Sequence, residues 1–218
     1  MNETTKETIV IAKPKIFIGI PTMGSVHVFT MIRILKFCTD AFAHQRYSVV
    51  IYPTSGVSPV DNARNEIVTE FLKGDATHLL WIDSDTIPPE GSLDKMLKDD
   101  KDIISGITPI IEYDEKRSKS DSNGYYKKWN CVGTDNKFVM PYTGIVPIHG
   151  AGGSFLLVKR AVYEKMEKPW YRFLYKDDNS TDCFIGEDVS FIAKSISLGF
   201  KPFCDTSIQC GHSKQIIW

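Results

Sequence analysis

The chain is poor in the features that mark several common classes of protein. It has five cysteines among 218 residues and no Cys-x-x-Cys pair, which argues against a disulfide framework and favours a reducing compartment. Its formal net charge is −1, so it lacks the broad basic field that proteins use to hold bare nucleic acid. A net charge near zero gives no electrostatic indication of nucleic-acid binding, but it does not exclude nucleic acid as a substrate.

Long apolar runs are also missing. No stretch of the sequence approaches the roughly 20 apolar residues that cross a bilayer, and residues 1–8 lack the basic and apolar regions of a signal peptide. We therefore expect no transmembrane segment and a cytoplasmic location, which would be the host cytoplasm for a phage-encoded protein. With 42% apolar and 24% charged residues, the chain has the composition of an ordinary globular domain.

What the chain does have is an apolar run that ends in two acids. Residues 79–82 read Leu-Leu-Trp-Ile, and Asp83-Ser84-Asp85 follows directly, which predicts a buried strand ending at the acids. Open α/β sheets bind ligands outside the carboxyl ends of their strands. Two carboxylates there suit Mg²⁺ or Mn²⁺, which commonly share their ligands with a substrate phosphate. An Asp-rich turn is the common alternative, but Pro88 and Pro89 already supply turn residues.

The first half of the sequence alternates between strand and helix patterns. Strands are predicted over 15–20, 47–52, 79–82 and 102–107, and helices from about 25, over 60–72 and over 92–97. This order predicts an α/β fold with a mostly parallel, right-handed wound sheet and helices on both faces.

The second half is less regular. Residues 112–124 are dense in charge and serine and predict an exposed loop. Short β-like runs over 138–148 predict a smaller β region; strands over 154–158 and 200–203 and a helix over 159–166 follow. We expect one domain over residues 1–218, with residues 1–14 as a flexible tail.

A second acidic pair opens a predicted helix at Gly186-Glu187-Asp188. Acids in a first helical turn are common because they complement the helix dipole. One of the two carboxylates could instead face a cleft and accept a proton from a substrate hydroxyl. The helix N-terminus should then hold the pKa of Asp188 low. Near the end of the chain, the spacing of the cysteines and His212 fits no structural zinc pattern.

Taken in order, these motifs resemble the GT-A-fold glycosyltransferases, especially the family 2-like inverting enzymes of the small bacterial or phage type. The resemblance covers residues 16–212. It is carried by a proline-ended first strand, Asn-Ala-Arg-Asn over 62–65, Trp-Ile-Asp-Ser-Asp over 81–85 with its DxD motif, Gly-Ala-Gly-Gly-Ser-Phe over 150–155, Gly-Glu-Asp over 186–188, and Gly-His over 211–212.

The resemblance implies transfer of a sugar from a nucleotide-sugar donor to an acceptor hydroxyl, with inversion, assisted by Mn²⁺ or Mg²⁺. A UDP-sugar is favoured, although the first strand lacks the acid that family members often place near uracil. The implied metal ligands are Asp83, Asp85 and His212. The implied donor-binding residues are Pro21, Thr22, Arg64, Asp83, Ser84, Gly152 and Gly153. Asp188 matches the catalytic base, with Glu187 as its neighbour or substitute.

The acceptor is less defined by the sequence. Tyr125 and Trp129 are candidate acceptor-binding residues, since aromatic faces suit sugar rings, so a saccharide or another hydroxylated acceptor is expected and modified DNA stays open. Two other classes also stay open. A nucleotidyltransferase would usually have a basic, Gly-rich loop after its first strand, which residues 21–25 do not supply. A non-catalytic nucleotide-sugar or saccharide-binding protein would have the fold without turnover.

Overall fold

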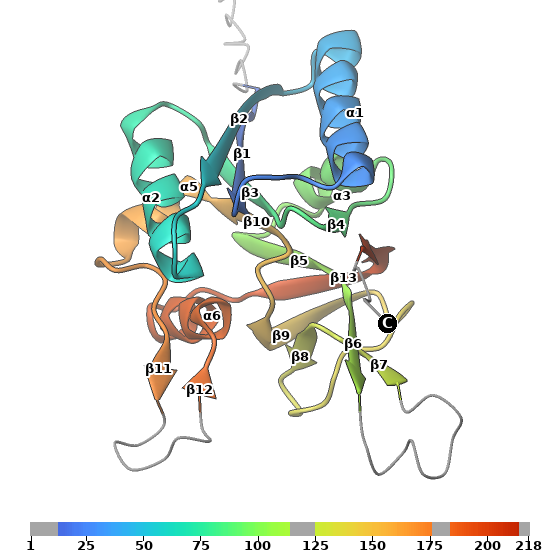
Figure 1. The fold of residues 1–218 in the computed structure, drawn as a ribbon, viewed down its shortest axis with the longest axis vertical. Helices are drawn as coiled ribbons and strands as arrows, with labels where there is room; N and C mark the ends of the chain where they lie inside the picture. Colours follow the sequence, from blue (N-terminus) through green and yellow to red (C-terminus); the bar gives the residue numbers. More distant parts are fainter. Residues whose placement is uncertain (1–12, 114–124, 176–183, 214–218) are drawn as a thin grey trace, which may run out of the picture.

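The computed structural model describes residues 13–113, 125–175 and 184–213 (Figure 1). They form a mixed α/β fold around one eight-stranded sheet of order β2-β1-β3-β10-β5-β13-β9-β8. The predicted tail over 1–14 and loop over 112–124 lie mostly outside the described residues. Glu112, however, belongs to strand β6 (Pro109–Tyr113), so that part of the loop prediction was wrong.

The five helices of the described residues and the strands of the main sheet have the following bounds. The helices are α1 (Val28–His44), α2 (Val60–Lys73), α3 (Ser92–Asp99), α5 (Arg160–Lys165) and α6 (Glu187–Ser197). The sheet strands are β1 (Lys15–Thr22), β2 (Ser48–Ser55), β3 (His78–Ile82), β5 (Ile103–Ile107), β8 (Cys131–Gly133), β9 (Ile145–Ala151), β10 (Phe155–Lys159) and β13 (Phe203–Gln209). Three strand pairs lie apart from it: β6 with β7 (Tyr125–Trp129), β4 (Thr86–Ile87) with β14 (Gly211–His212), and β11 (Leu174–Tyr175) with β12 (Phe184–Ile185).

Most strands of the sheet run in one direction. β1 is parallel to β2 and to β3, and β5 is parallel to β13. Only β10 and β9 run against their neighbours in this sheet of the described residues. The predicted mostly parallel sheet is therefore confirmed, with one change: antiparallel β10 lies between β3 and β5 and pairs with both.

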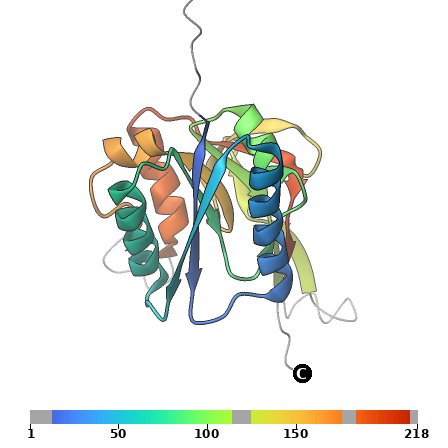
Figure 2. The same ribbon diagram turned by 90° about the horizontal axis from the view of Figure 1, so that it is seen from above.

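Alternating side chains of the central strands pack on opposite faces of the sheet. Leu79 and Trp81 lie in the core that also holds Ile67 of α2 and Phe191 of α6. Leu80 and Ile82 lie in the other core, with residues of α1 and α3. Figure 2 shows the sheet between α1 on one side and α2 and α6 on the other. The apolar run over 79–82 is uninterrupted because both faces of β3 are covered.

Several element boundaries differ from the predictions. The helix expected from about residue 25 begins at Val28, where the His27 side chain accepts a hydrogen bond from the Phe29 amide. The strand expected over 200–203 is β13, which begins at Phe203 and continues to Gln209. The β6–β7 pairing was not predicted. Among the described residues, none of the helices has the length and apolar character needed to span a membrane.

Candidate active site

The DxD motif lies in a tight turn at the carboxyl end of β3. The Thr86 amide donates to the Asp83 carbonyl at 3.0 Å, and Thr86 begins the short strand β4. Strand β14 pairs with β4 and sets His212 opposite Thr86. The end of the described chain is therefore brought beside a motif that lies more than a hundred residues earlier.

Asp85 and His212 are in direct contact. His212 Nε2 lies 3.1 Å from Asp85 Oδ2, and Nδ1 lies 2.8 Å from the Pro109 carbonyl oxygen. Because a carbonyl oxygen only accepts hydrogen bonds, Nδ1 must carry the hydrogen, and Nε2 is directed at the carboxylate. Metal-binding histidines commonly have this arrangement, with the other ring nitrogen donating to a backbone carbonyl.

Arg64 joins the two acidic motifs in a buried ion-pair network. Its side chain is 3% exposed; Nη2 donates to Asp83 Oδ1 and Nε donates to Glu187 Oε1, both at 3.0 Å. The guanidinium also lies 5.1 Å from the centre of the Trp81 ring. Burial opposes its charge, but Asp83 and Glu187 more than offset that effect and raise the pKa of Arg64.

The glycine segment before β10 lies against this guanidinium. A Cβ at Gly153 would come within 2.7 Å of Arg64 Cζ, which no side chain tolerates without displacing the arginine. The Gly153 amide donates to Asp188 Oδ2 at 3.1 Å. Gly153 therefore links Arg64 to Asp188, and its lack of a side chain serves the packing of Arg64.

Asp188 does not have the low pKa expected from its place in a first helical turn. Burial, and next the charge of Glu187, raise its pKa. Arg64 and the amides of Val189 and Gly153 act in the opposite direction but do not outweigh these effects. That prediction was wrong because desolvation of the carboxylate exceeds the contribution of the helix N-terminus.

Three of the predicted donor-binding residues line one cavity next to the DxD turn. Pro21, Thr22 and Ser84 border a space of about 240 Å³, together with Ser58, which precedes α2, and Ala63 in the first turn of α2. The Thr22 hydroxyl accepts hydrogen bonds from the Gly24 and Ser25 amides at 3.1 Å. This hydroxyl therefore shapes the loop that forms one wall of the cavity.

The arrangement of the predicted metal ligands differs from a closed three-residue site. Asp83 is bound to Arg64, whereas Asp85 and His212 contact each other. Across the described ranges, no group of three or more His, Cys, Asp or Glu side chains converges as a metal site. One carboxylate and one imidazole nonetheless form a donor set that fits a divalent cation able to complete its coordination with water and phosphate oxygens.

The two aromatic residues predicted to bind the acceptor have different outcomes. Trp129 is 8% exposed and lies in the same core as Trp81. Lys127 Nζ lies 4.1 Å from the centre of its ring. This packing favours a structural role for Trp129. Tyr125 begins strand β7, but its side chain lies outside the described part of the structure.

Asn130 is a site residue that the sequence did not indicate. Its carbonyl accepts from the Gly152 amide at 2.9 Å, and its side chain donates to Ser154 Oγ at 3.0 Å and accepts from the Thr108 amide at 2.8 Å. These bonds hold the Gly152 backbone on one side of Gly153 and the Ser154 side chain on the other. A single asparagine after an aromatic residue carries no motif, so only the folded contacts reveal this role.

Comparison with known proteins supports the fold. No protein-family model and no curated protein sequence matches the chain. A197 from STIV is similar in structure, with a TM-score of 0.57 and 19% identity over 93% of this chain and 86% of that chain. At this identity the similarity establishes the fold alone.

Two further solved structures are more distant. GalNAc-T7 with UDP, GalNAc and Mn²⁺ has a TM-score of 0.49 and 9% identity, over 96% of this chain and 45% of that chain. The inositol-1-phosphate CTP transferase from T. maritima has a TM-score of 0.44 and 8% identity, over 90% of this chain and 88% of that chain. Both structures are of transferases.

Proposed function

We propose that the chain is a metal-dependent glycosyltransferase that moves a sugar from a nucleotide-sugar donor, with a UDP-sugar favoured, to an acceptor hydroxyl with inversion. The observation that supports the proposal is that motifs distant in the sequence lie together at the carboxyl end of the central strand β3. Arg64 joins Asp83 to Glu187, and Gly153 joins Arg64 to Asp188. His212 contacts Asp85 on the same turn.

The donor would bind beside the DxD turn. The cavity bordered by Pro21, Thr22 and Ser84 lies where open α/β sheets bind nucleotides, and Asp85 with His212 would hold Mn²⁺ or Mg²⁺. When bound, the cation would offset negative charge on the departing diphosphate. Arg64 is assigned a positioning role, because two of its nitrogens are already bound to carboxylates and its side chain is buried.

Asp188 would be the base that accepts the proton of the attacking acceptor hydroxyl. Glu187 is 7% exposed and accepts a hydrogen bond from Arg64, so its carboxylate is committed to the ion-pair network. A pKa raised by burial makes Asp188 a stronger base than an exposed aspartate. Glu187 would act indirectly, by holding Arg64 and by adding negative charge near Asp188.

A turnover screen tests the proposal. The protein would be incubated with UDP-, GDP- and CDP-sugars and Mn²⁺, with saccharides, small polyols and hydroxymethylated duplex DNA as acceptors. We expect nucleoside diphosphate release and sugar transfer that EDTA abolishes. Asp188→Asn should lose turnover, while Asp135→Asn, a change of the same type at a side chain that is 64% exposed, should retain it.

Other results would select the other classes. Release of pyrophosphate from a nucleoside triphosphate, with no sugar transfer, would identify a nucleotidyltransferase. Binding of nucleotide sugars without turnover by any acceptor would identify a binding protein. An active Asp188→Asn beside an inactive Glu187→Gln would reverse the roles of the two acids.

A further inference from the structure

Several junctions between strands meet at one buried point beside the candidate site. Thr108, Asn130 and Cys210 are each the single residue between two consecutive strands, which are β5 and β6, β7 and β8, and β13 and β14. Ser154, the residue before β10, lies among them. Thr108 and Ser154 are 1% and 9% exposed, so their hydroxyl groups depend on partners inside the protein.

The side chains at these junctions form a hydrogen-bond chain with one direction. Asn130 Oδ1 accepts from the Thr108 amide at 2.8 Å, which leaves Asn130 Nδ2 to donate to Ser154 Oγ at 3.0 Å. Ser154 Oγ in turn donates to Thr108 Oγ1 at 2.8 Å. Burial raises the pKa of the Cys210 thiol to about 12, and a hydrogen bond with Thr108 acts in the opposite direction. Consecutive buried hydrogen bonds polarise one another, so the chain favours one arrangement of its members.

Ser154 is attached to both acidic motifs of the candidate site. Its carbonyl accepts a hydrogen bond from the Asp83 amide at 3.0 Å. It directly follows Gly153, whose amide donates to Asp188 Oδ2 at 3.1 Å. A displacement of Ser154 would therefore move both the start of the DxD turn and the amide that contacts Asp188.

Thr108 leads to the histidine on the other side of that turn. Its carbonyl accepts a hydrogen bond from the Asn130 amide at 3.1 Å, so both polar groups of its backbone are bound to Asn130. The next residue is Pro109, whose carbonyl oxygen lies 2.8 Å from His212 Nδ1. Because this carbonyl orients the ring, the position of Thr108 affects where His212 Nε2 is directed, and that atom lies 3.1 Å from Asp85 Oδ2.

We propose that Ser154 and Thr108 are positioning residues, and that the bond between their hydroxyl groups holds two parts of the candidate site in fixed positions relative to each other. One part carries Asp83 and Asp188, and the other carries His212. Neither hydroxyl has to touch a nucleotide or a cation to affect binding, because groups behind the ligands of a metal commonly change its affinity when they are removed. The inference rests on the function proposed above, which assigns the cation and the nucleotide to this turn.

Calorimetric titration of variants that lack these hydroxyl groups tests the proposal. UDP, GDP, CDP and ADP would be titrated into wild type with Mn²⁺, and the nucleotide that binds most tightly would then be titrated into Ser154→Ala, Thr108→Val and the double variant. Each single change should raise the dissociation constant roughly three- to tenfold, the effect of one hydrogen bond. The double variant should bind no more weakly than the single ones, because both changes remove the same bond. Thr108→Ser keeps the hydroxyl and should bind as wild type does.

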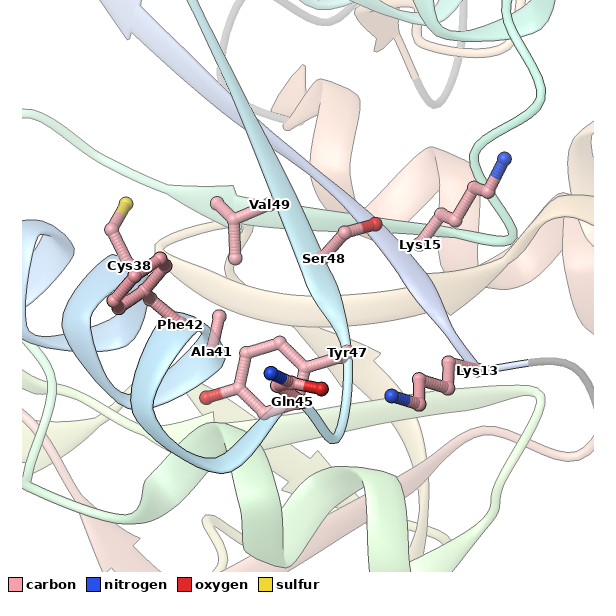
Figure 3. Close-up of a pocket in the computed structure, with 9 residues that line it drawn as sticks. All are labelled: Lys13, Lys15, Cys38, Ala41, Phe42, Gln45, Tyr47, Ser48 and Val49. Carbon is pink, nitrogen blue, oxygen red and sulfur yellow. The ribbon is translucent and has the colours of Figure 1, made fainter.

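Two controls separate this effect from a general loss of stability. Ser195→Ala removes a hydroxyl that is also buried, in a side chain that is 0% exposed and donates to the Ile192 carbonyl at 2.7 Å. Ser48→Ala removes a hydroxyl at the amino end of β2, beside the hollow of about 690 Å³ between α1 and β2 that Figure 3 shows. Both variants should bind the nucleotide as wild type does. Urea unfolding of each variant gives the loss of stability with which its change in affinity is compared.

The outcomes distinguish this inference from the function on which it rests. If wild type binds a nucleotide with Mn²⁺ and both single variants bind it equally well, the positioning role alone is overturned. A double variant whose loss of affinity is the product of the two single losses would mean that the hydroxyl groups act independently, which also overturns it. Equal weakening by Ser195→Ala would assign the effect to lost stability, with the same consequence. If wild type binds none of the four nucleotides with Mn²⁺, the proposed function and this inference are overturned together.

Discussion

Arg64 determines how the carboxylates of the candidate site are oriented. Its buried guanidinium fixes Asp83 on one side and Glu187 on the other, and a glycine is needed at position 153 to leave room for it. Its remaining nitrogen, Nη1, is buried without a hydrogen-bond partner among the described residues. A buried arginine that holds two acids is costly to disturb, because any loss leaves an uncompensated charge in the interior.

Arg64→Lys should therefore destabilise the protein although it keeps the charge. A lysine offers one ammonium in place of the fork that reaches both acids, so one carboxylate would be left unpaired, at a cost of about 3–5 kcal/mol. Urea unfolding measures the change. Arg33→Lys, at a more exposed ion pair with Glu90, should cost less than about 1 kcal/mol. Equal effects at the two sites would contradict the role given to Arg64.

The raised pKa of Asp188 predicts a pH dependence of turnover. A base must be deprotonated to act, so turnover should fall on acidification at a higher pH than it would for an exposed aspartate. Glu187→Gln removes a neighbouring negative charge that raises this pKa. The acidic limb of the pH–rate profile should therefore move to lower pH in that variant. A limb that stays in place or moves upward would show that Glu187 does not act on Asp188 in this way.

At the scale of elements, Lys95 ties α3 to the strand β13. Its ammonium pairs with Asp205, whose side chain is 1% exposed and also accepts from the Ser207 amide and hydroxyl at 3.0 and 2.8 Å. Burial opposes the charge of Asp205, but Lys95 and Ser207 more than offset it and lower its pKa. The register of β13 shifts directly after this residue, so the pair holds the strand where it turns toward β14.

Lys95→Met should leave the Asp205 carboxylate buried with weaker compensation and cost about 3 kcal/mol. Lys98→Met provides the matched control, because Lys98 is exposed on the same helix and its loss should change the free energy of unfolding by less than about 0.5 kcal/mol. Urea denaturation of both variants gives the comparison. A Lys95→Met protein as stable as wild type would mean that Ser207 alone satisfies the carboxylate.

The elements that the sequence predicted well are those with a strong local pattern. α2 and α6 begin where predicted because each has apolar residues at helical spacing and polar residues at its start. The antiparallel insertion of β10 was not predictable in this way. Its apolar run looks the same in either direction, and only pairing with β3 and β5 fixes its orientation.

The sequence indicated which residues belong to the candidate site, but not which of them contact one another or how deeply they are buried. The order of the motifs indicated Asp83, Asp85 and His212, and the structure places all three on or beside one turn. The bond between Asp83 and Arg64 and the raised pKa of Asp188 depend on burial. Burial arises from tertiary packing, which a single sequence does not encode locally.

At the scale of the whole molecule, His78 should make stability fall in acid. Burial, and next the charge of Lys159, lower the pKa of His78 to about 4, below its usual value of about 6.5. Between these values the unfolded chain binds the proton and the folded chain does not. Stability is therefore complete above about pH 6.5 and decreases as the pH falls toward 4, by up to about 3 kcal/mol.

His78→Gln removes this contribution. The free energy of unfolding of the variant should decrease less than that of wild type between pH 6.5 and 4, as measured by urea unfolding at several pH values. His44→Gln, at an exposed position at the end of α1, should follow the wild-type curve. A His78→Gln protein with the wild-type pH dependence would assign the acid sensitivity to other groups.

Isothermal titration calorimetry measures whether nucleotide binding by this chain depends on a divalent cation held at Asp85. UDP, GDP, CDP and ADP would be titrated into wild type and Asp85→Asn with Mn²⁺ and then with EDTA, with Asp135→Asn as the control. We expect that at least one nucleotide binds with Mn²⁺, that EDTA abolishes binding, and that Asp85→Asn weakens it at least about tenfold, or about 1.4 kcal/mol. Binding that neither EDTA nor Asp85→Asn changes, or no binding of any nucleotide, would contradict it.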